Sequence, residues 1–203
     1  IVISENLNFK EQSLSIDVSL HIGSLIAVLA FFYKDILNFF EKKKFLIKIL
    51  ISSIPVMIAG YLLVQTNFIE QLRNIKIIGW MTLVFGIVLF LTDKCKLEKE
   101  IDNNFTFKSA IIIGILQVLS LIPGVSRSGI TISAARILNF KRYDAAKISF
   151  LLSIPTLGAV SIFGIENIIS SHDINFSILN NFLILLSFLF SFITIKYFLK
   201  YIK

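Results

Sequence analysis

Several stretches of this chain are long, apolar and almost free of charge, and they constrain its fold more than any other feature. Charged residues make up 16% of the 203 residues, hydrophobic residues make up 56%, and the mean hydropathy is +0.83. A soluble domain of this length has too little interior to bury that much apolar surface. Apolar runs of about 18 residues or more are typical of membrane-spanning helices. The sequence therefore predicts an all-α, polytopic integral membrane protein.

Five of these runs are long enough to cross a bilayer, because a helix of about 22 residues covers about 33 Å and the hydrocarbon core is about 30 Å thick. The predicted spans are residues 17–39, 45–64, 75–91, 148–169 and 178–202. A further apolar segment, residues 109–138, is interrupted at Pro123 and Gly124. Each of its arms, of about 14 residues, is too short to cross alone, so we expect a re-entrant helical hairpin. Residues 1–203 are expected to form a single integral membrane domain.

The distribution of Lys and Arg distinguishes a hairpin from a single crossing. If residues 109–138 enter and leave on the same side, fifteen basic residues lie in cytoplasmic stretches and three lie outside. If the segment crosses once, nine lie on each side. Because Lys and Arg are enriched in cytoplasmic loops, this bias favours the hairpin, with the N-terminus of the chain outside and its C-terminus in the cytoplasm. The same loops explain the net charge of +7, so we expect no nucleic-acid partner.

The interruption carries polar residues at a depth where a membrane protein otherwise avoids them. Its sequence is "LIPGVSRSGITIS", residues 121–133. Pro123 lacks an amide donor and Gly124 relaxes the backbone, so the first arm is expected to end there. Ser126 or Ser128 can then cap the second arm by accepting hydrogen bonds from its first N–H groups. The start of that arm offers unpaired donors and about half a positive charge, which favours an anion.

Arg127 strengthens this prediction, because its planar guanidinium can bind two phosphate oxygens at once. Thr131 lies one turn further along and adds a hydroxyl on the same face. An arginine at the centre of a bilayer costs about 2.5–3.5 kcal/mol on insertion scales, so something must offset that cost. A structural alternative is that Arg127 hydrogen bonds the loose carbonyls of the kink while the serines only cap the helix. An anion-binding turn, moreover, serves transport as well as hydrolysis.

Three segments carry a family resemblance. "LIPGVSRSGITIS" with the following "RYDAAKISFLLSIPTLGA" resembles the second signature region of the undecaprenyl-diphosphate phosphatases, the bacitracin-resistance phosphatases. "SIDVSLHIGSLIAVLAFFYKDI" is similar to the segment after that family's first signature, and "FLILLSFLFSFITIKYFLKYIK" to its penultimate span. The resemblance implies an inverted-repeat fold in the bacterial inner membrane, with two re-entrant hairpins that meet near mid-membrane. It also implies hydrolysis of undecaprenyl diphosphate to undecaprenyl phosphate and phosphate, which recycles the carrier lipid of cell-wall synthesis.

The resemblance also implies roles for individual residues. Ser126 and Arg127 match the catalytic positions: Ser126 as nucleophile or phosphate ligand, and Arg127 as the clamp on the diphosphate that stabilises charge in the transition state. Gln117 is expected to orient a water or a phosphate oxygen. The other residues expected to contact the substrate are Gly124, Ser128, Gly129 and Thr131.

The implied partners are a polyprenyl diphosphate lipid, the membrane, a second copy of the chain and a divalent cation, Mg²⁺ or Ca²⁺, with no ligand in this chain. The family's first hairpin carries a glutamate pair and a Ser-Ser-Thr-Gly-His segment. Since this sequence starts just after that point and lacks a final span, we expect a fragment that is inactive alone. Two other hypotheses remain: a transporter or lipid flippase with an anion-binding broken helix, and a degenerate remnant with a purely structural role.

Overall fold

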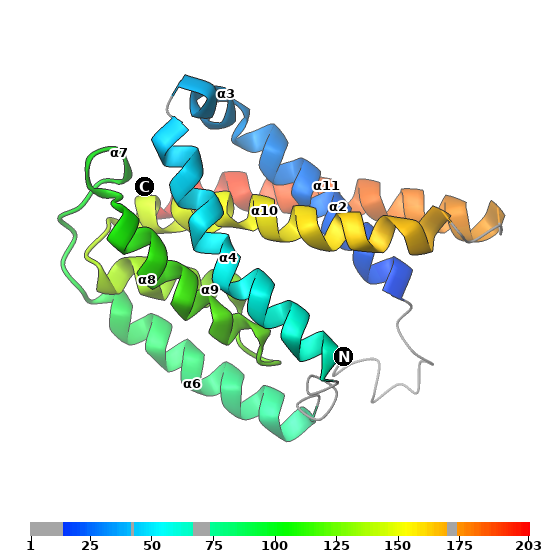
Figure 1. The fold of residues 1–203 in the computed structure, drawn as a ribbon, viewed down its shortest axis with the longest axis horizontal. Coiled ribbons are helices and arrows are strands. Elements are labelled where there is room, and N and C mark those ends of the chain that lie inside the picture. The colour runs from blue at the N-terminus through cyan, green and yellow to red at the C-terminus, as the bar shows by residue number, and fades with distance from the viewer. Residues whose placement is uncertain (1–13, 42, 67–73, 170–173) are drawn as a thin grey trace. The chain divides into compact units, whose positions relative to one another are not determined.

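The computed structural model describes residues 14–41, 43–66, 74–169 and 174–203, so the expected external N-terminus, residues 1–13, lies outside the described residues (Figure 1). Helices form the secondary structure of these ranges, and the β structure within them is one isolated bridge between Lys99 and Phe140. The elements are α2 (Leu14–Phe31), α3 (Tyr33–Glu41), α4 (Lys43–Gln65), α6 (Ile75–Asp93), α7 (Ile101–Asn104), α8 (Phe107–Gln117), the 3₁₀ segment η1 (Val118–Leu121), α9 (Arg127–Ile137), α10 (Arg142–Ile169) and α11 (Ile174–Ile202). The predicted all-α class is confirmed.

Within the described ranges, four helices are long and apolar enough to cross a bilayer. Their apolar windows are Lys43–Leu63, Ile75–Asp93, Arg142–Ile162 and Asn180–Ile202. These windows overlap the second to fifth predicted spans and confirm a polytopic membrane protein. The first predicted span, residues 17–39, is divided, because α2 ends at Phe31 and α3 starts at Tyr33. Lys34 and Asp35 follow this break directly, so the second half of the segment is too polar for the bilayer core.

The chain divides into two compact units, and the first comprises residues 1–36 and 153–201. In this unit α2 packs closely against α11. A side chain at Gly23 would lie 2.4 Å from the carbonyl oxygen of Ile184, so only glycine allows this approach. The Ser24 hydroxyl lies 3.1 Å from the Ser187 hydroxyl and 3.0 Å from the Ser191 hydroxyl. Small residues and interhelical hydroxyl bonds of this kind drive helix association within membranes.

The second unit comprises residues 37–152 with the last two residues, and it contains the interrupted segment. In this unit α8 packs against α4 and α9, and α9 also packs against α6 (Figure 1). A side chain at Gly114 would lie 2.4 Å from the carbonyl oxygen of Ser52, so α8 and α4 are in backbone contact there. The core between these helices includes the fully buried side chains of Ile113, Ala134 and Ile148. The short helices α8 and α9 are thus held on several sides by longer ones.

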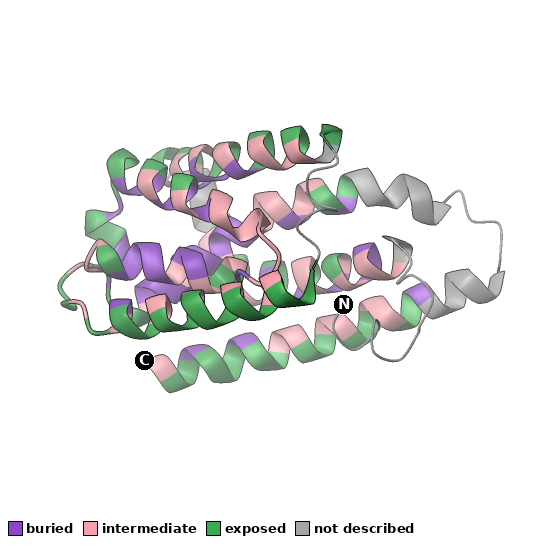
Figure 2. Ribbon diagram, turned by 90° about the horizontal axis from the view of Figure 1, so that it is seen from below, coloured by how far each residue is buried: buried purple, intermediate pink, exposed green. Residues whose placement is uncertain are grey.

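Apolar side chains also cover the outside of this unit. Along α6, Trp80 is 65% exposed, and other large exposed side chains on the same helix are Leu83, Val84, Ile87, Phe90 and Leu91. Figure 2 shows exposed residues along much of α6, whereas buried residues gather in α8 and α9. A soluble monomer rarely exposes so continuous an apolar surface. We conclude that the outer surface of α6 faces lipid.

Candidate active site

The interrupted segment folds as two short helices joined by a tight connection. Helix α8 ends at Gln117, one 3₁₀ turn continues to Leu121, and α9 begins at Arg127. The α-helix therefore ends six residues before Pro123, earlier than the sequence analysis expected. The reason is that a residue before proline is forced out of the helical region. Ile122 accordingly has an extended conformation (φ −76°, ψ 124°), so the preceding turn closes in 3₁₀ geometry.

The ends of this segment return to the same place. The amide of Lys99 donates to the carbonyl oxygen of Asn139 at 3.0 Å, and the amide of Lys141 donates to that of Lys99 at 3.0 Å. These bonds join the chain just before α7 and α8 to the chain just after α9. At 11 residues and about 16 Å each, α8 and α9 are each too short to cross a hydrocarbon core of about 30 Å.

Gly124 docks the connection onto α6. Its φ of +96° lies in the left-handed region, where glycine alone is free of strain. A side chain there would lie 2.5 Å from the carbonyl oxygen of Ile78, so the turn touches the α6 backbone. The Thr82 hydroxyl donates to the carbonyl oxygen of Gly124 at 3.1 Å. The sequence analysis did not single out Thr82, whose only signal was a hydroxyl within an otherwise apolar span.

Ser126, rather than Ser128, is the N-cap of α9. Its hydroxyl oxygen accepts a hydrogen bond from the amide of Gly129 at 3.2 Å and lies 3.2 Å from the Ser128 hydroxyl. A side chain at Gly129 would lie 3.2 Å from the Cβ of Ser126, so glycine here leaves room for the cap. Both serines are exposed. Two hydroxyls therefore flank the first turn of α9 on its accessible side.

Arg127 is the first residue of α9 and is partly buried. Its guanidinium is thus attached to the helix at the end where the macrodipole is positive. The first N–H groups of an α-helix have no acceptor within the helix itself, so they favour an anion in the same region. The structure therefore brings a cation, a helix N-terminus and two accessible hydroxyls together over three consecutive residues.

Thr131 and Gln117 lie behind the turn rather than on its accessible side. Thr131 is 1% exposed, and its hydroxyl donates to the carbonyl oxygen of Arg127 at 2.9 Å and lies 2.6 Å from the Ser149 hydroxyl. Ser149, on α10, was missed because nothing in the sequence indicates a contact across 18 residues. Gln117 is fully buried, and within the described residues neither its amide oxygen nor its amide nitrogen has a hydrogen-bond partner.

The groups at this turn do not fit a site for a hard divalent cation. Mg²⁺ and Ca²⁺ prefer carboxylate and carbonyl oxygens, whereas this turn offers serine hydroxyls, amide N–H groups and a guanidinium. Among the described residues, no group of three or more His, Cys, Asp or Glu side chains is placed to hold a metal ion. The turn is instead complementary to an anion.

Comparison with known proteins gives one consistent answer. Residues 1–203 match the family described as bacitracin resistance protein BacA. The chain is 48% identical over 197 residues to an undecaprenyl-diphosphatase of Pelagibacter ubique, a match that covers 96% of this chain and 76% of that protein. The corresponding protein of Roseobacter denitrificans is 42% identical over 160 residues (72% and 60% covered), and that of Aliivibrio salmonicida is 37% identical over 218 residues (100% and 80% covered).

Proposed function

The chain belongs to the family of bacitracin resistance protein BacA, and from this premise we propose that the start of α9 binds the diphosphate head of a polyprenyl lipid. The protein is a membrane hydrolase whose substrate is undecaprenyl diphosphate and whose products are undecaprenyl phosphate and inorganic phosphate. The observation that carries the site assignment is the geometry of Ser126 and Arg127, the N-cap and the first residue of α9, at a turn whose serine hydroxyls are accessible.

In this proposal Arg127 binds two oxygens of the diphosphate and neutralises the charge that develops as the bond between the terminal phosphorus and the bridging oxygen breaks. Ser126 acts as a ligand rather than as the nucleophile. Its two partners are an amide N–H and a hydroxyl, neither of which takes up a proton at neutral pH. A hydroxyl that accepts from the Gly129 amide still donates its own proton to a phosphate oxygen. Ser128, two residues further on, donates to the same headgroup.

The buried residues support this site from behind. Thr131 and Ser149 fix the carbonyl oxygen of Arg127 and with it the first turn of α9. Gly124 and Gly129 set the backbone that lets the headgroup approach. In this proposal the buried side-chain amide of Gln117 hydrogen bonds a water behind the turn. Leaving such a group without a partner costs about 1–3 kcal/mol.

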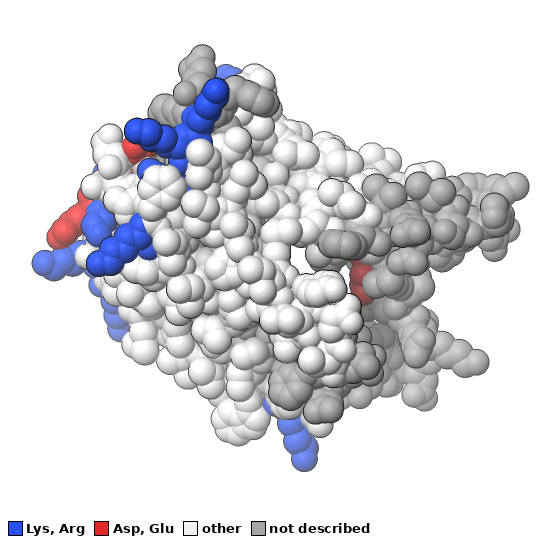
Figure 3. All heavy atoms as spheres, viewed as in Figure 1, with Lys and Arg blue, Asp and Glu red and all other residues white. Residues whose placement is uncertain are grey.

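We place the joined ends of α7–α9 at the cytoplasmic face of the bacterial inner membrane and the turn at mid-membrane depth. Basic side chains gather over the end of the molecule where α7 lies, as expected for cytoplasmic loops (Figure 3). Exposed lysines of this end include Lys94, Lys96 and Lys108. This orientation puts the N-terminus of the chain outside and its C-terminus in the cytoplasm.

Phosphate release in detergent tests the proposed function. The complete gene product, purified and mixed with undecaprenyl diphosphate, is expected to release one phosphate per lipid without any sealed compartment. A transporter or flippase requires such a compartment. Lipid translocation into sealed vesicles, with no phosphate released in either preparation, would overturn the assignment.

A further inference from the structure

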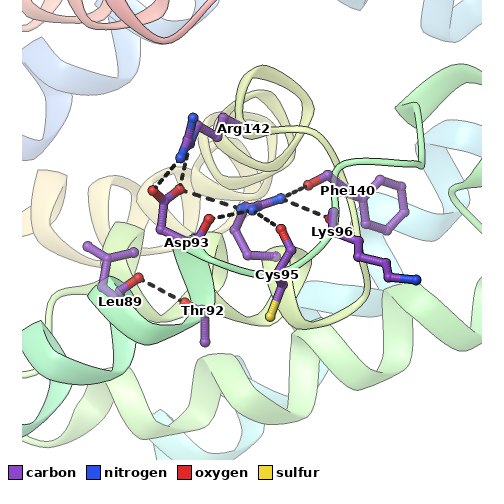
Figure 4. Close-up of polar contacts among 8 residues, drawn as sticks. Leu89, Thr92, Asp93, Cys95, Lys96, Phe140 and Arg142 are labelled. Atoms are coloured by element: carbon purple, nitrogen blue, oxygen red, sulfur yellow. Dashed lines mark hydrogen bonds and ion pairs between the residues drawn. The ribbon is translucent and has the colours of Figure 1, made fainter.

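A fully buried arginine lies at the opposite end of α9 from the proposed headgroup site. Arg136 is 1% exposed, and its guanidinium donates hydrogen bonds to the backbone carbonyl oxygens of four residues that Figure 4 labels. One terminal nitrogen donates to Phe140 at 2.6 Å and, at 3.4 Å, to Lys96. The other donates to Asp93 at 2.7 Å and to Cys95 at 2.6 Å. A carboxylate oxygen of Asp93 lies 3.6 Å from Nε.

This arrangement needs arginine specifically. A buried cation is unfavourable unless its charge and its donors are satisfied. Here carbonyl oxygens accept from both terminal nitrogens and the Asp93 carboxylate balances the charge, while Nε has no hydrogen-bond partner among the described residues. The acceptors lie around a planar fork, with two on each terminal nitrogen. A lysine ammonium has three donors at a single point and cannot reach all of them.

The cluster joins the end of α6 to the end of α9 and the start of α10. Asp93 is the last residue of α6, and its carboxylate accepts two hydrogen bonds of 2.7 Å from Arg142, the first residue of α10. The carbonyls of Cys95 and Lys96 belong to the chain that follows α6. Arg136 therefore fixes the carboxyl end of α9 against the carboxyl end of α6.

The other end of α9 is held against the same helix. Gly124, three residues before α9, touches the α6 backbone at Ile78 and accepts a hydrogen bond from Thr82. Helix α9 itself spans 11 residues, and an α-helix of about three turns is a rigid rod. We therefore expect a change at Arg136 to alter how Ser126 and Arg127 are placed along α6.

We propose that Arg136 is a positioning residue for hydrolysis, because its clamp on the end of α6 sets where Arg127 meets the diphosphate. The proposal rests on the proposed function. It assigns Arg136 no contact with the substrate, since the residue is buried at the far end of the helix.

Arg136→Lys in the complete gene product tests this assignment. The substitution keeps the charge but not the fork, so α9 loses part of its anchor. A misplacement of about 1 Å can lower a rate by up to about 100-fold, and we expect kcat per folded molecule to fall about 10-fold or more. KM is expected to change by less than about threefold, because no substrate contact is removed. A merely structural role would lower the yield of folded protein and leave kcat per folded molecule unchanged, and that result would overturn the proposal.

Lys141→Gln is the matched control at the same end of the unit. Lys141 is exposed and its ammonium is hydrogen-bonded to the Glu100 carboxylate, which raises the pKa of Lys141. This variant removes a charged partner near the cluster without touching Arg136, so kcat and KM are expected to stay at wild-type values. A loss equal to that of Arg136→Lys would show that any perturbation of this end lowers kcat, and it would contradict the specific role of Arg136.

If Arg136→Lys does not fold, Asp93→Asn replaces it. This change keeps the carbonyl acceptors and removes the carboxylate charge, so we expect the same selective loss of kcat, at about threefold. An unchanged kcat would refute the proposal.

Arg127→Ala, assayed in parallel, distinguishes a failure of the positioning role of Arg136 from a failure of the proposed headgroup site. An inactive Arg127→Ala with a normal Arg136→Lys contradicts only the positioning role, whereas a fully active Arg127→Ala contradicts the proposed site itself.

Discussion

Arg127→Ala is expected to lower kcat/KM for undecaprenyl diphosphate about 1,000-fold while the protein still inserts and folds. The guanidinium is the one positive side chain at the start of α9 in our proposal, and its interaction strengthens as charge moves onto the departing phosphate. Arginines that stabilise phosphoryl-transfer transition states contribute factors of about 10³–10⁵. Phosphate release measured over a range of lipid concentrations gives kcat and KM separately.

Two further variants sharpen the Arg127 experiment. Arg127→Lys keeps the charge and loses the two-pronged geometry, so an intermediate loss of about 100-fold is expected. Lys108→Ala removes an exposed cation from the first turn of α8 and is expected to keep full activity. Wild-type turnover by Arg127→Ala would show that the residue only satisfies the carbonyls of the kink, which is the structural alternative considered from the sequence.

Gly124→Ala is expected to abolish most activity by displacing the turn from α6. A left-handed conformation costs a non-glycine residue about 1–2 kcal/mol. The new methyl group would also lie 2.5 Å from the carbonyl oxygen of Ile78. A clash of this kind costs about 1–3 kcal/mol more. We therefore expect a lower thermal unfolding midpoint in detergent and a lower rate of phosphate release.

Gly86→Ala provides the matched comparison. Gly86 lies on α6, and a side chain added there meets no atom within 4 Å. Because alanine has a higher helix propensity than glycine, this variant is expected to be as stable as wild type or slightly more stable, with normal activity. Equal behaviour of Gly124→Ala and Gly86→Ala would contradict the docking of the turn on the α6 backbone.

The sequence predicted most of the fold because apolar run length alone identifies membrane helices. It failed within the first span, residues 17–39, where Lys34 and Asp35 follow the end of α2. It also placed the helix break at Pro123 itself. The structure shows that the constraint of proline on Ile122, together with a closing 3₁₀ turn, ends the α-helix at Gln117.

Local patterns predicted the start of α9, and they could not predict what holds it. Ser126 could be recognised as a cap because capping depends on residues within one turn. Thr82, Ser149 and Arg136 act through contacts with residues 18–43 positions away, and these contacts exist only once the helices pack. Thr131 is an example. The sequence places it one helical turn after Arg127, but only the packed structure shows that its hydroxyl bonds Ser149 behind the turn.

Thiol protection shows whether the diphosphate head lies at the start of α9. In a background in which serine replaces Cys95 and every other cysteine of the complete gene product, Ser128→Cys puts one thiol on the accessible side of this turn. Lys108→Cys puts one at the start of α8, the end of that helix far from the turn. A non-hydrolysable polyprenyl diphosphate analogue is expected to slow modification of the Ser128→Cys protein by about tenfold or more, because the bound headgroup covers the thiol. The modification rate of the Lys108→Cys protein is expected to stay unchanged. Equal modification rates at position 128 with and without the analogue would contradict the account.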